Sequence, residues 1–260
     1  MRKGGSMIIT IAAQKGGVSK TTTAAAMSQA LAHRGKKTLL IDTDAQGSAS
    51  LIYGAGASGG TYDLITGAAP AEKLIQETPA GNIIPASPLL DRLDIELNNK
   101  PGRDSFLKAG IEPIKGKFDF IIIDTAPGLG TCLVQALTAA DAVIIPLLCD
   151  PQALQGLHQA TETIEEVKKY CNPGLQIAAV VLTQYQARAT LTRQYEELIA
   201  EQCREMGLHL AKTRIRRAIA LQEAQASRES LYKYNEKCNP AIDYMDLCKE
   251  IGLTTKGKGR

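Results

Sequence analysis

Aromatic residues are scarce in this chain of 260 residues. Tryptophan is absent, and phenylalanine, tyrosine and tryptophan together make up 4% of the residues. Proteins that bind single-stranded nucleic acid commonly stack the bases on aromatic side chains, so the composition argues against that class of binding. It does not argue against folding, because 44% of the residues are hydrophobic and 22% are charged. Such values are typical of a globular protein rather than a disordered or coiled-coil chain.

Paired cysteines and long apolar runs are also lacking. The six cysteines include no C-x-x-C pair, and no apolar leader precedes the first strand-like run at residue 7. The most apolar stretches are interrupted by Asp124, Asp141 and Asp150 before they reach the roughly 18 to 20 residues that a membrane span requires. We therefore expect a reduced, cytoplasmic protein that does not cross a membrane.

A strong charge of one sign is the third absence. The net charge of +3 is too small to indicate a nucleic-acid-binding protein by itself. Residues 1–150 carry equal numbers of basic and acidic side chains, so the surplus lies in residues 151–260. Residues 188–217 hold seven basic residues against four acidic ones, and residues 212–217 (KTRIRR) hold four bases and no acid. The small surplus is therefore concentrated in one segment.

Short apolar runs alternate with helix-compatible segments along most of the chain. Five of them are typical of buried strands and two are weaker; in chain order the seven are Met7–Ala13, Lys37–Asp42, Asn82–Pro85, Phe118–Asp124, Ala142–Leu148, Gln176–Leu182 and Leu208–Lys212. This alternation predicts an α/β fold with a doubly wound, mostly parallel sheet flanked by helices. No linker is long enough to separate two domains. We expect one domain over residues 7–253, a flexible N-terminus over 1–6 and a disordered basic tail over 254–260. The glycine-rich stretch Tyr53–Gly60 is expected to be an exposed loop.

A glycine-rich turn follows the first predicted strand. Residues 14–22 read QKGGVSKTT and precede a predicted helix over Lys20–His33. At such a junction backbone N–H groups and the helix dipole converge on an anion. Lys20 would reach the β- and γ-phosphates of a nucleotide, and Thr21 would offer its hydroxyl to Mg²⁺. The standard expression G-x-x-x-x-G-K-[ST] fails, because Gln14 and Ser19 occupy its two glycine positions, whereas K-G-G-x-x-K-[ST] fits.

That variant is the deviant Walker A motif of the ParA/MinD group of P-loop ATPases. The chain resembles the short, Soj-like ParA proteins of plasmid and chromosome partition. The resemblance extends over TLLIDTDAQGSAS (38–50), FDFIIIDTAPGLG (118–130), ADAVIIPLLCDPQALQGL (140–157) and, more loosely, IALQEA (219–224). It implies a P-loop NTPase fold and a weak intrinsic ATPase that binds ATP or ADP with Mg²⁺ between the two subunits of an ATP-dependent homodimer.

The resemblance also implies roles for the residues of this loop. Lys15 would reach across the dimer to the partner's phosphates, and Lys20 would act on the phosphates of its own subunit, so both are candidate catalytic residues. Ser19 stands where the family usually has glycine, and its side chain at a tight turn bears on nucleotide affinity or exchange. The implied nucleotide contacts are Lys15, Gly16, Gly17, Val18, Ser19, Lys20, Thr21 and Thr22.

Three aspartates follow predicted strands. Asp124 ends an apolar strand at its carboxyl edge, where open α/β sheets bind ligands, and matches the Walker B acid that holds Mg²⁺ through water. Asp42 and Asp44 are separated by one residue, so in extended geometry their side chains point the same way and indicate a nearby cation or water network. The resemblance assigns Asp44 to orienting the attacking water. Asp42 is a further candidate near the metal, and the alternative is that it caps a turn.

Contacts to the base and to DNA are expected from the second half of the chain. Thr183 with Gln184, and Ile215 with Arg216, match family positions near the adenine. In the family, the ATP-bound dimer binds double-stranded DNA without sequence preference through arginines on this surface. The candidates here are Arg188, Arg193, Arg214, Arg216 and Arg217. Another usual arginine falls on Ala220. The alternative is a solvated face, or pairing with Glu196, Glu197 and Glu201.

Three functions are compatible with these motifs. The first is a cytoplasmic, nucleoid-associated DNA-partition ATPase whose hydrolysis is stimulated by a ParB-like centromere-binding partner. The second keeps the same switch but positions another cargo on the nucleoid or a membrane. Acidic residues Asp243, Asp246 and Glu250 on the last predicted helix, about Pro240–Ile251, argue against the membrane version. The third is a metabolic or redox relative, such as a dethiobiotin synthetase-like ligase or a nitrogenase iron-protein-like reductase, for which only Cys132 lies near a suitable cluster position.

Overall fold

The computed structural model describes residues 6–56 and 58–254. The predicted flexible N-terminus and basic tail therefore lie outside the described residues, apart from Ser6 and Thr254. Ser6 is buried, and its hydroxyl donates to the carbonyl of Phe118 (2.7 Å) and accepts from the N–H of Gly116 (3.1 Å). The prediction of a flexible N-terminus over 1–6 is therefore wrong at Ser6, because a buried polar side chain with two partners is held in place.

One sheet runs through the whole molecule. The described residues form eight strands: β1 (Met7–Ile11), β2 (Thr38–Asp42), β3 (Gln76–Thr78), β4 (Gly81–Ile84), β5 (Phe120–Asp124), β6 (Ala142–Leu147), β7 (Gln176–Tyr185) and β8 (Leu210–Arg216). Their order across the sheet is β3-β4-β2-β5-β1-β6-β7-β8, and every neighbouring pair is parallel except β3 with β4. The predicted single α/β domain with a mostly parallel sheet is confirmed.

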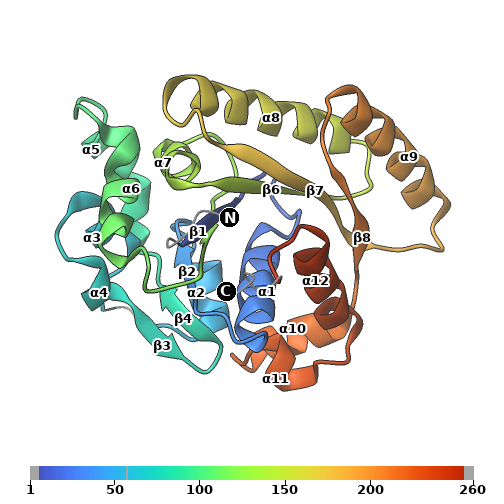
Figure 1. Cartoon of the computed structure of the whole chain (residues 1–260), viewed down its shortest axis with the longest axis horizontal. Helices are drawn as coiled ribbons and strands as arrows, with labels where there is room; N and C mark the ends of the chain where they lie inside the picture. Colours follow the sequence, from blue (N-terminus) through green and yellow to red (C-terminus); the bar gives the residue numbers. More distant parts are fainter. Residues whose placement is uncertain (1–5, 57, 255–260) are drawn as a thin grey trace, which may run out of the picture.

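Helices cover both faces of this sheet (Figure 1). The α-helices of the described residues are α1 (Lys20–His33), α2 (Ser48–Tyr53), α3 (Thr61–Thr66), α4 (Ala71–Leu74), α5 (Leu93–Glu96), α6 (Phe106–Ile111), α7 (Thr131–Ala139), α8 (Ala153–Tyr170), α9 (Thr190–Glu205), α10 (Ile219–Ala226), α11 (Leu231–Asn235) and α12 (Asn239–Glu250). Helices α7 and α8 lie on one side of the central strands, and α1 and α12 lie on the other. In the part of the chain that the structure describes, no helix is both long enough and apolar enough to span a membrane.

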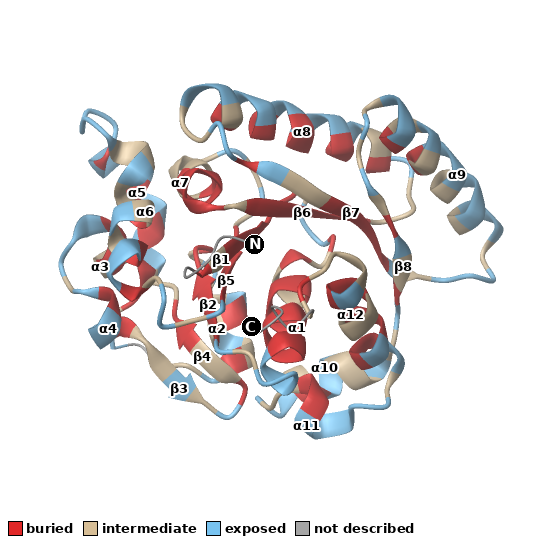
Figure 2. Cartoon of the chain, in the orientation of Figure 1, coloured by how far each residue is buried: buried red, intermediate tan, exposed pale blue. Residues whose placement is uncertain are grey.

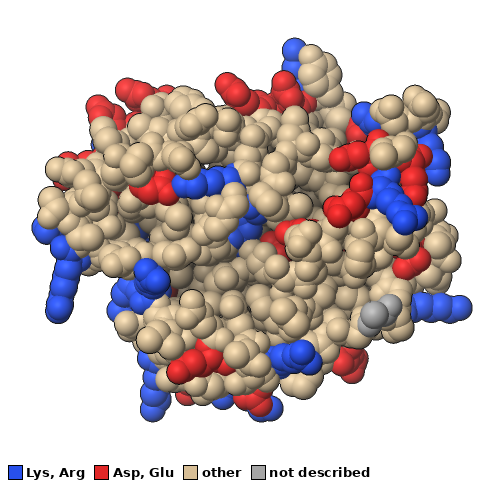
Figure 3. Space-filling model, turned by 180° about the vertical axis from the view of Figure 1, so that it is seen from behind, with Lys and Arg blue, Asp and Glu red and all other residues tan. Residues whose placement is uncertain are grey.

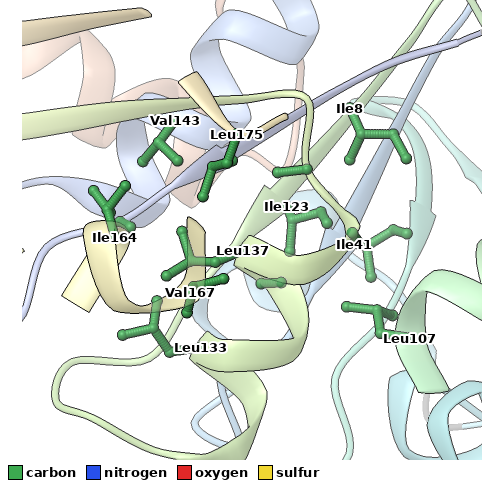
Figure 4. Close-up of a cluster of buried hydrophobic side chains, with 14 of the residues drawn as sticks. Ile8, Ile41, Leu107, Ile123, Leu133, Leu137, Val143, Ile164, Val167 and Leu175 are labelled. Atoms are coloured by element: carbon green, nitrogen blue, oxygen red, sulfur yellow. The ribbon is translucent and has the colours of Figure 1, made fainter. Parts of the chain in front are cut away.

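The hydrophobic core has two halves, one on each face of the sheet. Alternate residues of a strand face opposite sides, so Ile8 packs with the helices on the α7 side, whereas Ile9 packs with α1 and α12. Figure 2 shows the central strands almost wholly buried and the helices buried on their inner surfaces. Figure 4 shows the first half of the core, where Leu133 and Leu137 of α7 and Ile164 of α8 face the sheet. Burial on both faces explains why the parallel strands are near-continuous apolar runs.

The predicted exposed loop Tyr53–Gly60 is wrong at both ends, and one strand was not predicted. Tyr53 is the last residue of α2 and is fully buried, and Gly60 is also buried, so the exposed residues lie between these two. Strand β3 was not predicted, because its sequence, Gln-Glu-Thr, has no apolar pattern. It forms as the edge partner of β4, through a tight turn in which Gly81 has a φ of 132°. Pairing with a strand that already belongs to the sheet overrides weak local propensity.

Two of the three acidic residues of α12 bind backbone N–H groups of the neighbouring strand β8. Asp243 is buried and accepts hydrogen bonds from the backbone N–H of Arg216 (2.9 Å) and from its guanidinium group. Glu250 accepts from the N–H groups of Lys212 (2.6 Å) and Thr213 (2.9 Å). Two carboxylates of α12 thus occupy N–H groups of the edge strand β8. Of the three acidic residues, Asp246 is the one that pairs with a neighbour on its own helix, Lys249.

Replacement of Asp243 should destabilise the protein, whereas replacement of Asp246 should not. The Asp243→Ala change leaves the backbone N–H of Arg216 and its guanidinium group without their partner, and we expect a loss of about 1–3 kcal/mol in the free energy of unfolding. The Asp246→Ala change breaks an exposed pair with Lys249 and should cost less than about 0.5 kcal/mol. Urea unfolding of both variants at pH 7.5 measures the difference. Equal effects would show that the contact of Asp243 with β8 contributes nothing to the free energy of unfolding.

Candidate functional site

The loop between β1 and α1 is held through its carbonyl groups. The carbonyl of Lys15 accepts from Nζ of Lys20 (2.9 Å), that of Gly17 from Nε2 of Gln184 (3.1 Å), and that of Val18 from Oγ1 of Thr183 (3.1 Å). Residues 16 and 17 form a turn, and the backbone N–H groups of Gly16, Gly17 and Ser19 have no acceptor in the described part of the chain. Unpaired N–H donors at the N-terminus of a fourteen-residue helix form an arrangement that binds an anion.

One glycine of this loop is required by its backbone conformation, and two glycines border open space. Gly17 has a φ of 76°, which other residues adopt only with strain. A Cβ atom on Gly16 or Gly17 would meet nothing within 4 Å, so both residues border open space. Val18, by contrast, is buried and anchors the loop in the protein. Thr22 lies one residue beyond Thr21 in the first turn of α1, and its hydroxyl contacts the side chain of Gln225 at 3.4 Å. The loop is thus anchored on one side by Val18 and faces open space on the side formed by Gly16 and Gly17.

The carboxyl group of Asp124 is fully buried and has no ion-pair partner in the described chain. Apart from a contact with the Thr21 hydroxyl, its two oxygens have no hydrogen-bond partner among the described residues. Burial and the neighbouring carboxylate of Asp42 hold the pKa of Asp124 well above its usual range. Lys20 is also buried, and this burial lowers the pKa of its ammonium group, while Asp124 and Asp44 act in the opposite direction. Two buried carboxylate oxygens beside a threonine hydroxyl at position 21 fit a hard cation such as Mg²⁺.

Asp42 has a structural role, which was the alternative for this residue. Its carboxylate accepts hydrogen bonds from the N–H of Asp44 (3.1 Å) and from the N–H (2.8 Å) and hydroxyl (2.7 Å) of Ser50. The Ser50 hydroxyl in turn accepts from the N–H of Ala86. Burial raises the pKa of Asp42 to about 6. These contacts fix the segment from Asp42 to α2, and they use both Asp42 oxygens, so they give the predicted metal role of this residue no support.

Asp44 lies in the same segment and is also buried. Its Oδ1 atom accepts from the N–H of Gln46 (3.0 Å), which closes a turn before α2. No hydrogen bond to its second carboxylate oxygen is present within the described residues. Asp42 and Asp124 are direct neighbours in the register of β2 and β5, so Asp44, two residues after Asp42, lies just beyond the same edge of the sheet. One oxygen of Asp44 therefore remains available to a ligand.

Lys15 is bound within its own chain. Its Nζ atom donates to Oδ2 of Asp150 at 2.5 Å, and about 30% of each side chain is exposed. Asp150 was not a candidate from the sequence, although it follows β6 at the same edge of the sheet at which Asp124 ends β5. An acid after a predicted buried strand was the signal that could have identified it.

The predicted base contacts divide into two groups. Thr183 and Gln184, at the end of β7, bind the loop carbonyls directly. Ile215, however, is buried in the core on the α1 side of the sheet, and Arg216 is held by Asp243. The alternation of β8 turns the Ile215 side chain inward and directs Arg216 to α12, so neither contacts the loop before α1, and their adenine contacts stay a prediction.

Two of the five predicted DNA-binding arginines are paired inside the protein. Arg214 forms an ion pair with Glu196 (2.6 Å), and the other oxygen of Glu196 accepts from the hydroxyl of Tyr185 (2.5 Å). Arg216 is held by Asp243. At positions 214 and 216 the alternative of pairing with carboxylates is therefore observed in the single chain, and the DNA contact of these two arginines stays a prediction. Arg188, Arg193 and Arg217 are exposed, and none of them has an ion-pair partner in the described residues.

Removal of the charge at Asp124 should stabilise the protein in the absence of ligands. A carboxyl group with a raised folded-state pKa binds its proton more tightly in the folded than in the unfolded chain, so its ionisation costs stability increasingly as the pH rises. We expect Asp124→Asn to raise the free energy of unfolding by about 1–3 kcal/mol at pH 7.5 and by less at pH 5. Asp119→Asn, an exposed carboxyl near the start of β5, is the matched control and should change little. A destabilised or pH-independent Asp124→Asn variant would contradict the assignment of an unpaired buried charge.

Comparison with known proteins shows which family this chain belongs to. The family model described as "AAA domain" matches residues 6–177. The chain is 38% identical to the sporulation initiation inhibitor protein Soj of Bacillus subtilis, a match that covers 94% of this chain and 97% of that protein. It is 37% identical to the chromosome partitioning protein ParA of Caulobacter vibrioides, with 94% and 93% covered.

A similar solved structure is that of cobyrinic acid a,c-diamide synthase from Mycobacterium smegmatis with bound ADP and magnesium. It has a TM-score of 0.83 and 29% sequence identity, and the match covers 94% of this chain and 93% of that one. The chain therefore belongs to the AAA domain family and, within it, to the Soj/ParA group of P-loop ATPases, enzymes that use ATP and Mg²⁺.

Proposed function

We propose that this protein is a DNA-partition ATPase in which MgATP binding drives formation of a homodimer and nonspecific binding to double-stranded DNA. A ParB-like centromere-binding partner stimulates hydrolysis and so releases the dimer from the nucleoid. The observation that carries the proposal is the unpaired, fully buried Asp124 carboxylate beside Lys20 at the start of α1, in a chain similar to Soj and ParA over 94% of its length.

Each residue of the site has a separate task in this proposal. The N–H groups of residues 16–19 and the ammonium group of Lys20 bind the phosphates, while Thr21 and, through water, Asp124 hold the cation. When bound, Mg²⁺ neutralises charge on the phosphates and orients them for in-line attack. The free oxygen of Asp44 accepts a hydrogen bond from the attacking water and orients it. Asp42 supports Asp44 through the turn that it closes.

Lys15 connects hydrolysis to dimer formation. In the single chain its charge is neutralised by Asp150. In the dimer, we propose, Lys15 leaves this carboxylate and places its charge on the phosphates bound by the partner subunit, where it stabilises the charge that develops during transfer. A half-exposed ion pair contributes little free energy, so a phosphate group can compete with it. In this proposal Lys15 therefore changes its partner only when a second subunit is present.

The DNA contact in this proposal relies on the arginines that remain unpaired. Arg188 and Arg193 lie at and just before the start of α9, and Arg217 directly follows β8. Figure 3 shows basic and acidic side chains interspersed over one face of a single subunit, without a dense basic patch. Modest charge on one subunit gives weak binding, and pairing two subunits doubles the number of phosphate contacts and so raises affinity steeply.

Retention on random-sequence duplex DNA tests this function. We expect retention with ATP and Mg²⁺ at low salt, loss of retention with ADP, and a steep fall as the salt concentration is raised, because each phosphate contact releases counterions. Equal retention with ATP and ADP, or none with ATP, would refute the DNA role. A parallel arm with anionic lipid vesicles tests the alternative of a membrane-positioned cargo.

The arginine contribution is tested by reversing one charge. Arg188→Glu should weaken ATP-dependent DNA binding by about tenfold or more and leave ATP-driven dimerisation unchanged. The matched control is Arg34→Glu, which makes the same change at the opposite end of α1 from the phosphate loop and should bind DNA nearly as the wild type does. Loss of both DNA binding and dimerisation in Arg188→Glu would assign this arginine a structural role instead.

The two loop lysines should fail in different ways. Lys20→Ala removes the buried cation of the site and should abolish nucleotide binding, whereas Lys15→Gln should bind nucleotide but lose dimerisation or hydrolysis. Fluorescent-nucleotide titration, size-exclusion chromatography and phosphate release measure the three properties. Normal hydrolysis by Lys15→Gln would show that the lysine does not act across the dimer.

Asp150→Asn provides the complementary variant, because it frees Lys15 without removing it. We expect its ATP-driven dimer to form at a protein concentration about two- to fivefold lower than for the wild type. A dimer that needs the same or a higher concentration would show that the pair with Asp150 does not compete with dimer formation.

A further inference from the structure

Ser19 has an unusual conformation for its residue type. Its φ and ψ are 67° and 32°, the left-handed region, and it is one of three non-glycine residues with positive φ in the described chain. Serine is common at helix N-caps because its side chain binds an N–H of the first turn, but Ser19 makes no such bond. The strain at this position is therefore not compensated by capping.

The Ser19 hydroxyl instead has a partner in β7. The side-chain amide of Gln184 donates to Oγ of Ser19 and to the carbonyl of Gly17, each at 3.1 Å. Gln184 is exposed and is itself in the left-handed region, with a φ of 49°. Two of the three strained non-glycine residues are thus hydrogen-bonded to each other. Because Gln184 is exposed, packing in the core does not fix its side chain. Its two hydrogen bonds to the loop do.

The residue before Gln184 fixes the other side of the same contact. Thr183 is buried, and its hydroxyl contacts the carbonyls of both Val18 and Leu147 at 3.1 Å. The end of β7 therefore holds three consecutive loop residues, Gly17, Val18 and Ser19, from outside. With glycine at position 19, one of these three attachments would not exist.

We propose that Gln184 and Ser19 form a latch that keeps the phosphate loop in its binding conformation and slows nucleotide release. Gln184 is a positioning residue in this scheme: it holds the loop and does not touch the base. The inference rests on the nucleotide-binding role proposed above and adds to it a control on exchange. A pre-formed loop loses less entropy when it binds phosphate, and such pre-organisation acts mainly on the dissociation rate.

The dissociation rate of a fluorescent ADP, N-methylanthraniloyl-ADP with Mg²⁺, chased with unlabelled ADP, tests the latch. Loss of ordinary hydrogen bonds changes an equilibrium by about 2- to 10-fold, so we expect Gln184→Ala to release nucleotide about 3- to 10-fold faster and Ser19→Ala about 2- to 4-fold faster. The double variant should release no faster than Gln184→Ala, because both changes break the same contact. Gln186→Ala removes a nearby exposed glutamine and should match the wild type.

Ser19→Gly separates the latch from a general effect on folding. Glycine relieves the left-handed strain, so the thermal midpoint of this variant should equal or exceed that of the wild type while nucleotide release becomes faster. Affinity for ATP relative to GTP should remain unchanged in Gln184→Ala, whereas a direct base contact would alter that ratio. An altered ratio, unchanged release rates or additive effects in the double variant would each overturn the latch.

Failure of the latch is distinguishable from failure of the proposed function. If wild-type protein does not bind the fluorescent nucleotide, the ATPase site itself is wrong, and the latch is overturned with it. If it binds and all variants release at the wild-type rate, the latch alone is overturned.

Discussion

The carboxylate of Asp124 is fully buried at the end of β5, and in the described chain only the Thr21 hydroxyl approaches it as a hydrogen-bond donor. A protein tolerates such a group only when something else at the site requires it. Neighbouring features are arranged around it: Lys20 enters from α1, Asp42 lies beside it in register on β2, and the glycine-rich loop borders open space. The buried carboxyl group lowers the stability of the fold, and the burial of apolar side chains on both faces of the sheet offsets this loss.

Hydrogen bonds to backbone groups keep this edge of the sheet in order. Asp42 binds Ser50 and the N–H of Asp44, which fixes the segment after β2, while Thr183 and Gln184 fix the loop after β1. Asp42 holds the segment that follows its own strand, whereas Thr183 and Gln184 hold the loop that follows a different strand, β1. The loop before α1 is therefore fixed by β7, which is far from it in the sequence.

Charge in the second half of the chain serves mainly to close the sheet. Asp243 and Glu250 occupy N–H groups of β8, and Glu196 joins Arg214 to Tyr185. An exposed edge strand invites unwanted pairing, and α12 covers part of this edge. Between residues 188 and 217, the exposed basic side chains that have no ion-pair partner in the described residues are Arg188, Arg193, Arg204, Lys212 and Arg217. Two of the four bases of KTRIRR, Arg214 and Arg216, pair with carboxylates, so the net charge of this segment overstates the charge available to DNA.

The sequence by itself determined the parallel sheet, the position of α1 and the identity of the loop residues, because apolar runs and the K-G-G-x-x-K-T spacing are local signals. It also singled out Asp124, since an acid at the end of a buried strand has few structural uses. Only the tertiary structure decided the partners: Asp150 for Lys15, Ser50 for Asp42, Asp243 for Arg216, and Gln184 for Ser19. Each of these pairs joins residues at least eight positions apart, two of them link segments that follow or belong to different strands, and no local pattern encodes which side chains the fold will bring together.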